Sequence, residues 1–276
     1  MLIEKIINNN IVSSFDDLGH EVVVMGRGLG FNSKPGQQID NLKIEKIFRM
    51  DSQVESEQLQ AVLSDIPLEI IQVCNEIIAY AKTALSNKLS KNIYITLTDH
   101  INFAIQRYKQ DIHFTNALLW EIKKFYHQEF MTGLKAIELI KEKLGITLTQ
   151  DEAASIALHF VNAELRTEMP NTINITKLIQ NILKIVTYHF QVVINEDTLN
   201  YERFLTHLKF FSQRVISNHN NHGEDQVFHD MIKNQYPDAY ECALKIKEYV
   251  EKEHEIILPD EELIYITVHI KRILMN

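Results

Sequence analysis

The sequence predicts an α+β protein of several domains, in which a small N-terminal antiparallel β module precedes two tandem all-α helical-bundle domains. Residues 1 to about 55 contain short runs rich in β-branched residues, whereas apolar residues recur at helical spacing from Glu55 onward. Glycine and proline number only 8 and 5 in 276 residues, which is typical of a mostly helical chain. The helical part also repeats itself once, so we expect two similar helical domains.

The N-terminal module is expected to hold four strands, joined in the middle by a hairpin turn over Asp16-Asp17-Leu18-Gly19. A sheet this small buries little surface on its own. We therefore expect it to dimerise, which would cover its edges or one face. The expected strands are residues 2–7, 10–15, 21–24 and 43–48.

A glycine-rich stretch, Val-Met-Gly-Arg-Gly-Leu-Gly-Phe from Val24 to Phe31, follows the third expected strand. Strand interiors usually avoid glycine, so three of them at a strand end indicate a sharp bend or the close approach of another molecule. Arg27 supplies a planar charged fork and Phe31 a stacking face, which suit phosphates and unstacked bases. The alternative is a hairpin turn with one solvated arginine. A dinucleotide-binding loop is excluded because residues 32–36, Asn-Ser-Lys-Pro-Gly, do not begin a helix.

The turn Asn8-Asn9-Asn10 is the second candidate contact in this module. Asparagine favours turns, but its amide also offers a donor and an acceptor to base edges. Residues 1–55 contain 6 Lys and Arg against 8 Asp and Glu, a net charge of 6 − 8 = −2. This balance argues against non-specific duplex binding, which depends on counterion release, and leaves room for a compact site on a folded RNA.

The whole chain carries a formal net charge of −9, so no global basic field attracts nucleic acid or an anionic membrane. No apolar run approaches the roughly 18 residues of a membrane span, and the N-terminus lacks the apolar region of a signal peptide. Cys74 and Cys242 form no motif. The simplest inference is that both are reduced thiols in a cytoplasmic protein. We expect no membrane insertion.

Residues 53–56 are polar and are expected as the boundary between the β module and the helical part. Pro67 is expected just inside a helix whose apolar positions run from Ile70 to Ala81. Residues 218–225 are expected as a polar loop. The other expected helices are residues 93–108, 117–144, 149–165, 173–190, 197–217, 226–234, 238–254 and 259–274.

Four histidines occupy repeated positions in the two helical parts. His100 and His207 are each followed six and seven residues later by Gln-Arg, at an offset of 207 − 100 = 107. His159 follows the expected helix start Thr-Gln-Asp-Glu, and His269 follows the similar start Pro-Asp-Glu-Glu, at an offset of 269 − 159 = 110. Tyr126 and Tyr236 are separated by the same offset. Two modules of about 105 residues are too long for solenoid units, so we infer a duplicated domain.

A single histidine on an amphipathic helix is most often a packing or capping residue, but four at duplicated positions suggest a shared task. Metal binding would require ligand spacings that are absent around these histidines. General-base catalysis would require a nucleophile or substrate pocket that no nearby motif supplies. Reversible phosphorylation of imidazole requires a neutral, reachable ring nitrogen and neighbours that can accommodate the added charge. We therefore assign no catalytic residue, metal ligand or cofactor.

Arg107 and Arg214 lie two helical turns after His100 and His207 and point the same way round the helix, either toward the histidine or into an exposed ion-pairing face. Asp99 could orient the ring of His100 or cap a turn. The pair His229-Asp230 resembles a metal phosphohydrolase motif without its further ligands. Six other histidines are expected at the surface or in packing positions: His113, His127, His189, His219, His222 and His254.

Five segments together resemble the bacterial sugar-operon transcriptional antiterminators of the BglG/SacY type, and the chain is most similar to the β-glucoside branch. The similarity covers essentially the whole chain. The segments that carry it are Asn8-Asn9-Asn10, Val24 to Phe31, Thr98-Asp99-His100 with Asn102-Phe103-Ala104, Leu158-His159-Phe160-Val161-Asn162-Ala163 and Thr206-His207-Leu208-Lys209-Phe210.

The resemblance implies an RNA-binding module over residues 1–55 and two phosphotransferase-system regulation domains over residues 65–169 and 172–276. The first would bind an mRNA leader hairpin as a homodimer and keep an overlapping terminator from forming. For RNA contact, the residues that match the family pattern are Asn10, Gly26, Arg27 and Phe31.

In the family, the sugar permease phosphorylates the first regulation domain and inhibits the protein, and the general phosphocarrier protein phosphorylates the second and activates it. His100 and His159 match the first pair, and His207 and His269 the second. The alternative from another class is a helical metal-dependent hydrolase that uses the same histidines. A DNA-binding regulator is disfavoured because the N-terminal module offers no recognition helix.

Overall fold

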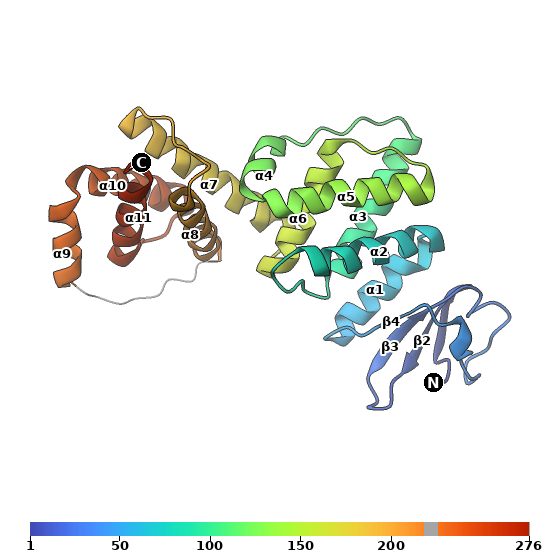
Figure 1. Ribbon diagram of the computed structural model, residues 1–276. Coiled ribbons are helices and arrows are strands. Elements are labelled where there is room, and N and C mark those ends of the chain that lie inside the picture. The colour runs from blue at the N-terminus through green and yellow to red at the C-terminus, as the bar shows by residue number, and fades with distance from the viewer. Residues whose placement is uncertain (218–225, 276) are drawn as a thin grey trace. The chain divides into compact units, whose positions relative to one another are not determined.

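The computed structural model describes residues 1–217 and 226–275, which divide into two compact units, Met1–Arg166 and Thr167–Asn276 (Figure 1). The first unit contains a four-stranded sheet and the helices that follow it, and the second is helical. The predicted order, a small antiparallel β module and then helical bundles, is confirmed. The loop expected over residues 218–225, with His219 and His222, lies outside the described residues.

The sheet is antiparallel, and its strands lie in chain order: β1 (Lys5–Asn8), β2 (Ile11–Phe15), β3 (Glu21–Met25) and β4 (Lys46–Phe48). β2 and β3 form the expected hairpin. Asp16 shapes its turn, because Oδ1 accepts hydrogen bonds from the backbone N–H groups of Leu18 and His20, both at 3.0 Å.

β1 and β4 begin three residues later than the sequence predicted. Leu2 forms only an isolated bridge with Gln38, outside the regular strands. Residues Asn41–Lys43 form a 3-10 helix, because the Oδ1 of Asp40 accepts a hydrogen bond from the backbone N–H of Leu42 at 3.0 Å and caps the turn. At the second of these places, a local side-chain bond therefore overrides the β-branched pattern.

Both faces of the sheet are covered within the same chain. Val12, Val22 and Val24 face one way and pack against Leu29 and Ile39 from the loop between β3 and β4. The opposite face, which includes Ile11, Val23 and Met25, joins the core built by the following helices. The strand order leaves β1 and β4 as the edges that a second chain could extend.

Helix α1 spans Gln53–Asp65, so residues 53–56 form its first turn and not the polar boundary that was expected. Ser52 caps this helix, since its Oγ accepts a hydrogen bond from the backbone N–H of Glu55 at 3.2 Å. Glu55 in turn accepts one from the backbone N–H of Asp51 at 3.1 Å. A polar sequence of the Ser-x-x-Glu form starts a helix as readily as it links domains.

The other helices of the first unit are α2 (Leu68–Ala84), α3 (Ile93–Lys109), α4 (Leu119–Phe125), α5 (His127–Leu144) and α6 (Gln150–Leu165). The single helix expected over residues 117–144 is therefore two, because Tyr126 leaves the helical region at φ −128° and ψ 53°. Its side chain is buried, so the break places the ring in the core.

The second unit consists of α7 (Met169–Phe190), α8 (Leu199–Ile216), α9 (Gln226–Gln235), α10 (Pro237–His254) and α11 (Asp260–Ile273). Tyr236 precedes α10 at φ −132° and ψ 60°, just as Tyr126 precedes α5. The helices that carry the repeated histidines also pair in the same way, α3 against α6 and α8 against α11. The sequence repeat is thus a repeat of packing.

Cys74 and Cys242 are buried free thiols, and burial raises the pKa of each to about 12. Both therefore stay protonated at neutral pH and contribute to packing. Among the helices of the described residues, none has the length and apolar character that crossing a membrane requires.

Candidate functional site

The glycine-rich stretch after β3 follows a path that side chains would block. A Cβ atom on Gly26 would collide with the carbonyl oxygen of Lys43, and one on Gly30 with the carbonyl oxygen of Asn8. Gly28 has φ +71°, in the left-handed region. The close approach expected from these glycines is therefore made, in part, by the chain's own backbone.

The asparagine turn is hydrogen-bonded to this stretch. The backbone N–H of Gly26 donates to the carbonyl oxygen of Asn10 at 2.9 Å, and that of Gly30 to Asn9 at 3.0 Å. The side-chain Oδ1 of Asn10 accepts a further bond from the N–H of Gly28 at 2.9 Å. Two segments that the sequence singled out separately thus form one structure, which we call the asparagine–glycine loop, residues 8–10 and 26–31.

Arg27 and Phe31 lie exposed on this loop, with 62% of Phe31 accessible to solvent. An exposed ring and an exposed guanidinium can stack on a base and pair with a phosphate. Gly26 is buried and serves the loop's shape, and Asn10 is half-buried with its oxygen engaged by Gly28. Of the four candidate RNA-contact residues, two therefore present side chains outward and two hold the loop.

The first histidine pair lies between α3 and α6. The rings of His100 and His159 are 4.7 Å apart between centroids, with planes inclined by 39°. The Nε2 of His100 is 3.4 Å from Oε2 of Glu152, whose Oε1 accepts a hydrogen bond from a terminal guanidinium nitrogen of Arg107 at 2.7 Å. The guanidinium also lies over Phe103, 4.5 Å from the ring centroid.

The second pair repeats this arrangement between α8 and α11. His207 and His269 stack at 4.8 Å with planes inclined by 20°. The Nε2 of His207 is 4.0 Å from Oε2 of Glu262, and Arg214 pairs with Oε1 at 2.6 Å through a terminal nitrogen and at 2.9 Å through Nε. Each module therefore has one site of two histidines, a glutamate and an arginine, which we call the histidine sites.

The two histidine sites differ in exposure. The Arg107 and Glu152 side chains are 14% and 6% exposed, whereas those of Arg214 and Glu262 are 33% and 18% exposed. The first site is therefore the drier of the two, and its ion pair is less screened by solvent. All four histidine side chains are partly exposed, although one ring nitrogen of each is buried: Nε2 of His100 and His207, and Nδ1 of His159 and His269.

Burial keeps most of these imidazoles neutral at pH 7. It lowers the pKa of His159 well below the ordinary value, with a further contribution from the charge of His100. Burial also lowers the pKa of His207 to about 4 and reduces that of His269. A neutral imidazole has a ring-nitrogen lone pair available as a nucleophile, which phosphorylation requires.

Glu152 stays ionised in spite of its position. Burial raises the pKa of its carboxyl, but the neighbouring His100 and Arg107 outweigh that effect and leave the pKa below its ordinary value. A full negative charge therefore faces His100 in the unmodified protein. An anionic group added to the His100 ring would be repelled by the Glu152 carboxylate.

The glutamates were missed by the sequence reasoning, which considered Asp99 as the residue that orients His100. Asp99 is exposed, and the carboxylate comes from α6 instead. A signal was available, because Glu152 and Glu262 occupy equivalent places in the repeat at an offset of 262 − 152 = 110. Of the two orientations left open for Arg107 and Arg214, their bonds to these glutamates show the one toward the histidine pairs.

The other histidines stand apart from these sites. His113 and His127 are exposed, and His189 and His254 are partly exposed. His229 Nδ1 is 3.5 Å from Asp230, but within residues 1–217 and 226–275 no group of three His, Cys, Asp or Glu side chains could hold a metal ion. The described geometry thus offers charge and nucleophilicity at the histidine sites and a stacking and phosphate-pairing surface on the loop.

Comparison with known proteins covers the full length of the chain. The CAT RNA binding domain matches residues 1–57, and the PRD domain matches twice, over residues 75–163 and 180–273. The chain is 50% identical to the transcription antiterminator LicT of Bacillus subtilis, with 99% of each chain covered. It is 44% identical to the beta-glucoside operon antiterminator of Dickeya chrysanthemi, covering 99% of this chain and 96% of that relative.

A solved structure is also similar to part of the chain. The crystal structure of GlcT CAT-PRDI matches with a TM-score of 0.52 and 31% sequence identity. The match covers 59% of this chain and 97% of the GlcT fragment. The order of a CAT module followed by a helical PRD module is thus shared with a crystallised protein.

Proposed function

The chain belongs to the family of bacterial transcription antiterminators that combine a CAT RNA binding domain with PRD domains, and from this premise we propose that it is a sugar-responsive antiterminator acting on an mRNA leader. In this proposal, a homodimer binds a leader hairpin in the cytoplasm and keeps an overlapping terminator from forming, so that polymerase reads through. The role is regulatory and not enzymatic. The single observation that carries it is full-length similarity to two antiterminators.

The RNA contact is proposed on the asparagine–glycine loop. Arg27 would pair with the hairpin phosphates or a base edge, and the exposed Phe31 ring would stack on an unpaired base. Gly26 and Asn10 would fix the loop's path, as their close contact and hydrogen bond suggest. Shape and stacking, and not net charge, would supply the affinity, because residues 1–55 carry a net charge of −2.

The histidine sites are proposed as phosphorylation switches. A neutral ring nitrogen would attack the phosphorus of a donor protein, and the bond between phosphorus and the donor would break as the new nitrogen–phosphorus bond forms. A phosphoryl group carries about −1.5 to −2 charges at neutral pH. On the ring of His100 it would lie close to the ionised Glu152, whose Oε2 is 3.4 Å from Nε2 before modification.

This repulsion suggests how the switch would work. Arg107, now paired with Glu152, would gain a second and more highly charged partner on His100. Moving Arg107 from carboxylate to phosphate would change how α3 is held against α6, and the same exchange is available to Arg214 and Glu262. We propose that the sugar permease phosphorylates the first site to inhibit the protein and that the general phosphocarrier protein phosphorylates the second to activate it.

The test is binding of the full chain to a leader RNA hairpin from its own operon, beside duplex DNA of the same sequence. We expect RNA-selective binding that Arg27→Ala abolishes while the thermal unfolding temperature stays unchanged. Equal binding to both nucleic acids, or full binding by the variant, would contradict the proposal. The hydrolase alternative predicts instead a stoichiometric bound metal and turnover, and no comparison favours it.

A further inference from the structure

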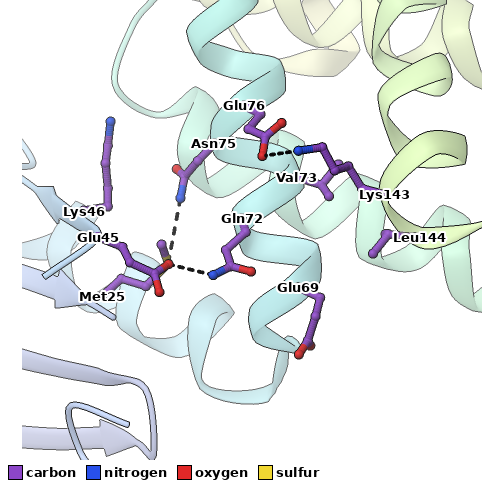
Figure 2. A pocket seen from close by; sticks show the side chains of 10 residues that line it. All are labelled: Met25, Glu45, Lys46, Glu69, Gln72, Val73, Asn75, Glu76, Lys143 and Leu144. Carbon is purple, nitrogen blue, oxygen red and sulfur yellow. Dashed lines mark hydrogen bonds and ion pairs between the residues drawn. The ribbon is translucent and has the colours of Figure 1, made fainter. Parts of the chain in front are cut away.

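Arg27, the exposed cation of the asparagine–glycine loop, is held at its backbone by a residue that also holds a helix of the first helical module. The Oε1 of Glu45 accepts a hydrogen bond from the backbone N–H of Arg27 at 3.3 Å. Its Oε2 accepts one from Nε2 of Gln72 on α2 at 2.7 Å (Figure 2). One carboxylate therefore connects the proposed RNA contact to the regulatory part of the chain.

Asn8 makes a second connection of the same kind. Its Oδ1 accepts a hydrogen bond from the backbone N–H of Asn10 at 2.8 Å. Its Nδ2 donates to the carbonyl oxygens of Leu63 and Ser64, at 3.0 and 3.3 Å, in the last turn of α1. The carbonyls at a helix end have no partner within the helix, so Asn8 satisfies groups that α1 itself leaves open. Two candidate RNA-contact residues are thus connected to helices: Arg27 through Glu45 to α2, and Asn10 through Asn8 to α1.

The Glu45 connection borders an open cleft of about 470 Å³ that several charged side chains line. Figure 2 shows Glu45 reaching from the sheet toward Gln72, while Glu76 on the same helix pairs with Lys143 at 3.0 Å. Apart from Met25, Val73 and Leu144, the lining is charged or polar, so Glu45 and Gln72 meet at a surface that water reaches. A hydrogen bond in such a place can break and re-form, because water can replace either partner.

Helix α2 also packs against α3, which carries His100. A displacement of α3 would therefore move Gln72, because α2 packs against α3. Movement of Gln72 would in turn affect the backbone of Arg27, because the Glu45 carboxylate is bonded to both. Rigid helices and two hydrogen bonds form a continuous physical route between the first histidine site and the loop.

We propose that Gln72 and Glu45 are positioning residues through which the first helical module sets the conformation of Arg27 in the RNA-binding loop. The inference rests on the proposed RNA-binding function and adds the route by which that site is regulated. Gln72 does not itself touch RNA in this scheme. It holds the Glu45 carboxylate, and the carboxylate holds the Arg27 N–H in place before the hairpin arrives.

The first test is Gln72→Leu in the full chain, which leaves the net charge unchanged and suits a helix. Losing one hydrogen bond of this kind should weaken binding to the leader hairpin about 3- to 10-fold. Thr83→Val on the same helix is the matched control, because it removes a hydrogen bond to the carbonyl oxygen of Tyr80 without a change of charge. Both variants should keep the unfolding temperature of the wild type.

A double-mutant cycle identifies the route. If Gln72 acts through Glu45, then Gln72→Leu has no further effect on RNA affinity once Glu45→Gln is present. Affinity of Gln72→Leu within 1.5-fold of the wild type, or losses that simply multiply in the double variant, would overturn the proposal.

A measurement without RNA separates this inference from the proposed function. Amide hydrogen exchange at Arg27 should speed up about 3- to 10-fold in Gln72→Leu and stay unchanged in Thr83→Val. An unchanged exchange rate at Arg27 in Gln72→Leu would refute the positioning role even if no hairpin bound. Failure of the wild type to bind RNA, with faster exchange in Gln72→Leu, would refute the RNA function alone.

Discussion

Replacing Glu152 by glutamine should destabilise the first unit strongly, because it leaves the guanidinium of Arg107 without its charged partner. The two side chains are 6% and 14% exposed, and their atoms are 2.7 Å apart. Removing one member of a buried ion pair costs about 3–5 kcal/mol. Arg107 keeps its contacts with the rings of Phe103 and Phe114, at 4.5 and 4.8 Å, so we expect a loss of about 2–4 kcal/mol.

The second histidine site supplies a comparison within the same chain. Glu262→Gln removes the equivalent carboxylate, but Arg214 is 33% exposed and water can solvate it once the pair is broken. We expect a loss of about 1 kcal/mol at this site. Glu138→Gln is the surface control, because the side chains of Glu138 and Lys135 are 56% and 35% exposed and their pair is screened by solvent.

Differential scanning calorimetry of the full chain measures all three variants. For a unit of this size, 1 kcal/mol corresponds to about 2–4 °C, so Glu152→Gln should lower the transition of the first unit by about 5–15 °C. Arg107→Met in the Glu152→Gln background should recover most of the loss, because the unpaired charge is then gone. Equal shifts for Glu152→Gln and Glu138→Gln would show that the buried pair does not carry the stability we assign to it.

Three further predictions concern pH, the glycine loop and the proposed switch. Folding lowers the pKa of His207 from 6.5 to about 4, so its stabilising effect is complete above pH 6.5 and is lost as pH falls toward 4. The full pKa shift corresponds to about 3 kcal/mol of unfolding free energy. The unfolding free energy should therefore change less between pH 7 and 4.5 in His207→Gln than in the wild type. The same change in both proteins would contradict a lowered pKa of His207. Gly26→Ala places a Cβ against the carbonyl oxygen of Lys43. It should lower the free energy of unfolding in urea by more than about 2 kcal/mol and abolish hairpin binding. A variant with wild-type stability and binding would show that the loop adapts. His207→Asp and His269→Asp should each mimic part of the activating charge and raise read-through in a transcription assay, and loss of antitermination in both would count against that role.

Local features of the sequence were sufficient for the order of elements, the repeated histidines and the glycine-rich stretch. Alternating β-branched residues marked the strands, and helical spacing marked the helices, because both patterns arise from neighbours in the chain. The duplicated His and Arg positions, seven residues apart, left Arg107 either toward His100 or on an exposed ion-pairing face, and its bond to Glu152 decided between the two. The glycine-rich stretch was predicted to need its glycines, and the structure shows why: a Cβ on Gly26 or Gly30 would collide with a carbonyl oxygen, and Gly28 has a positive φ.

The errors occurred where a local signal had two outcomes. Residues 53–56 were expected as a polar boundary, but they form the first turn of α1, which Ser52 and Glu55 cap. The helical pattern over residues 117–144 passes through Tyr126 without interruption, yet the ring is buried only because the backbone breaks there. The core, and not the local pattern, decided this break.

Tertiary structure alone decided which residues face each other across elements. Glu152 stands 52 positions from His100, by the difference 152 − 100, and Glu45 stands 27 positions from Gln72. No helical or strand period connects such residues, since each period describes only one element. The sequence by itself therefore determined the modules, the repeated histidines and the glycine loop. Packing decided that a carboxylate lies beside each histidine pair and that another holds the loop to α2, because hydrogen bonds and ion pairs between distant residues form only once the cores that carry them are assembled.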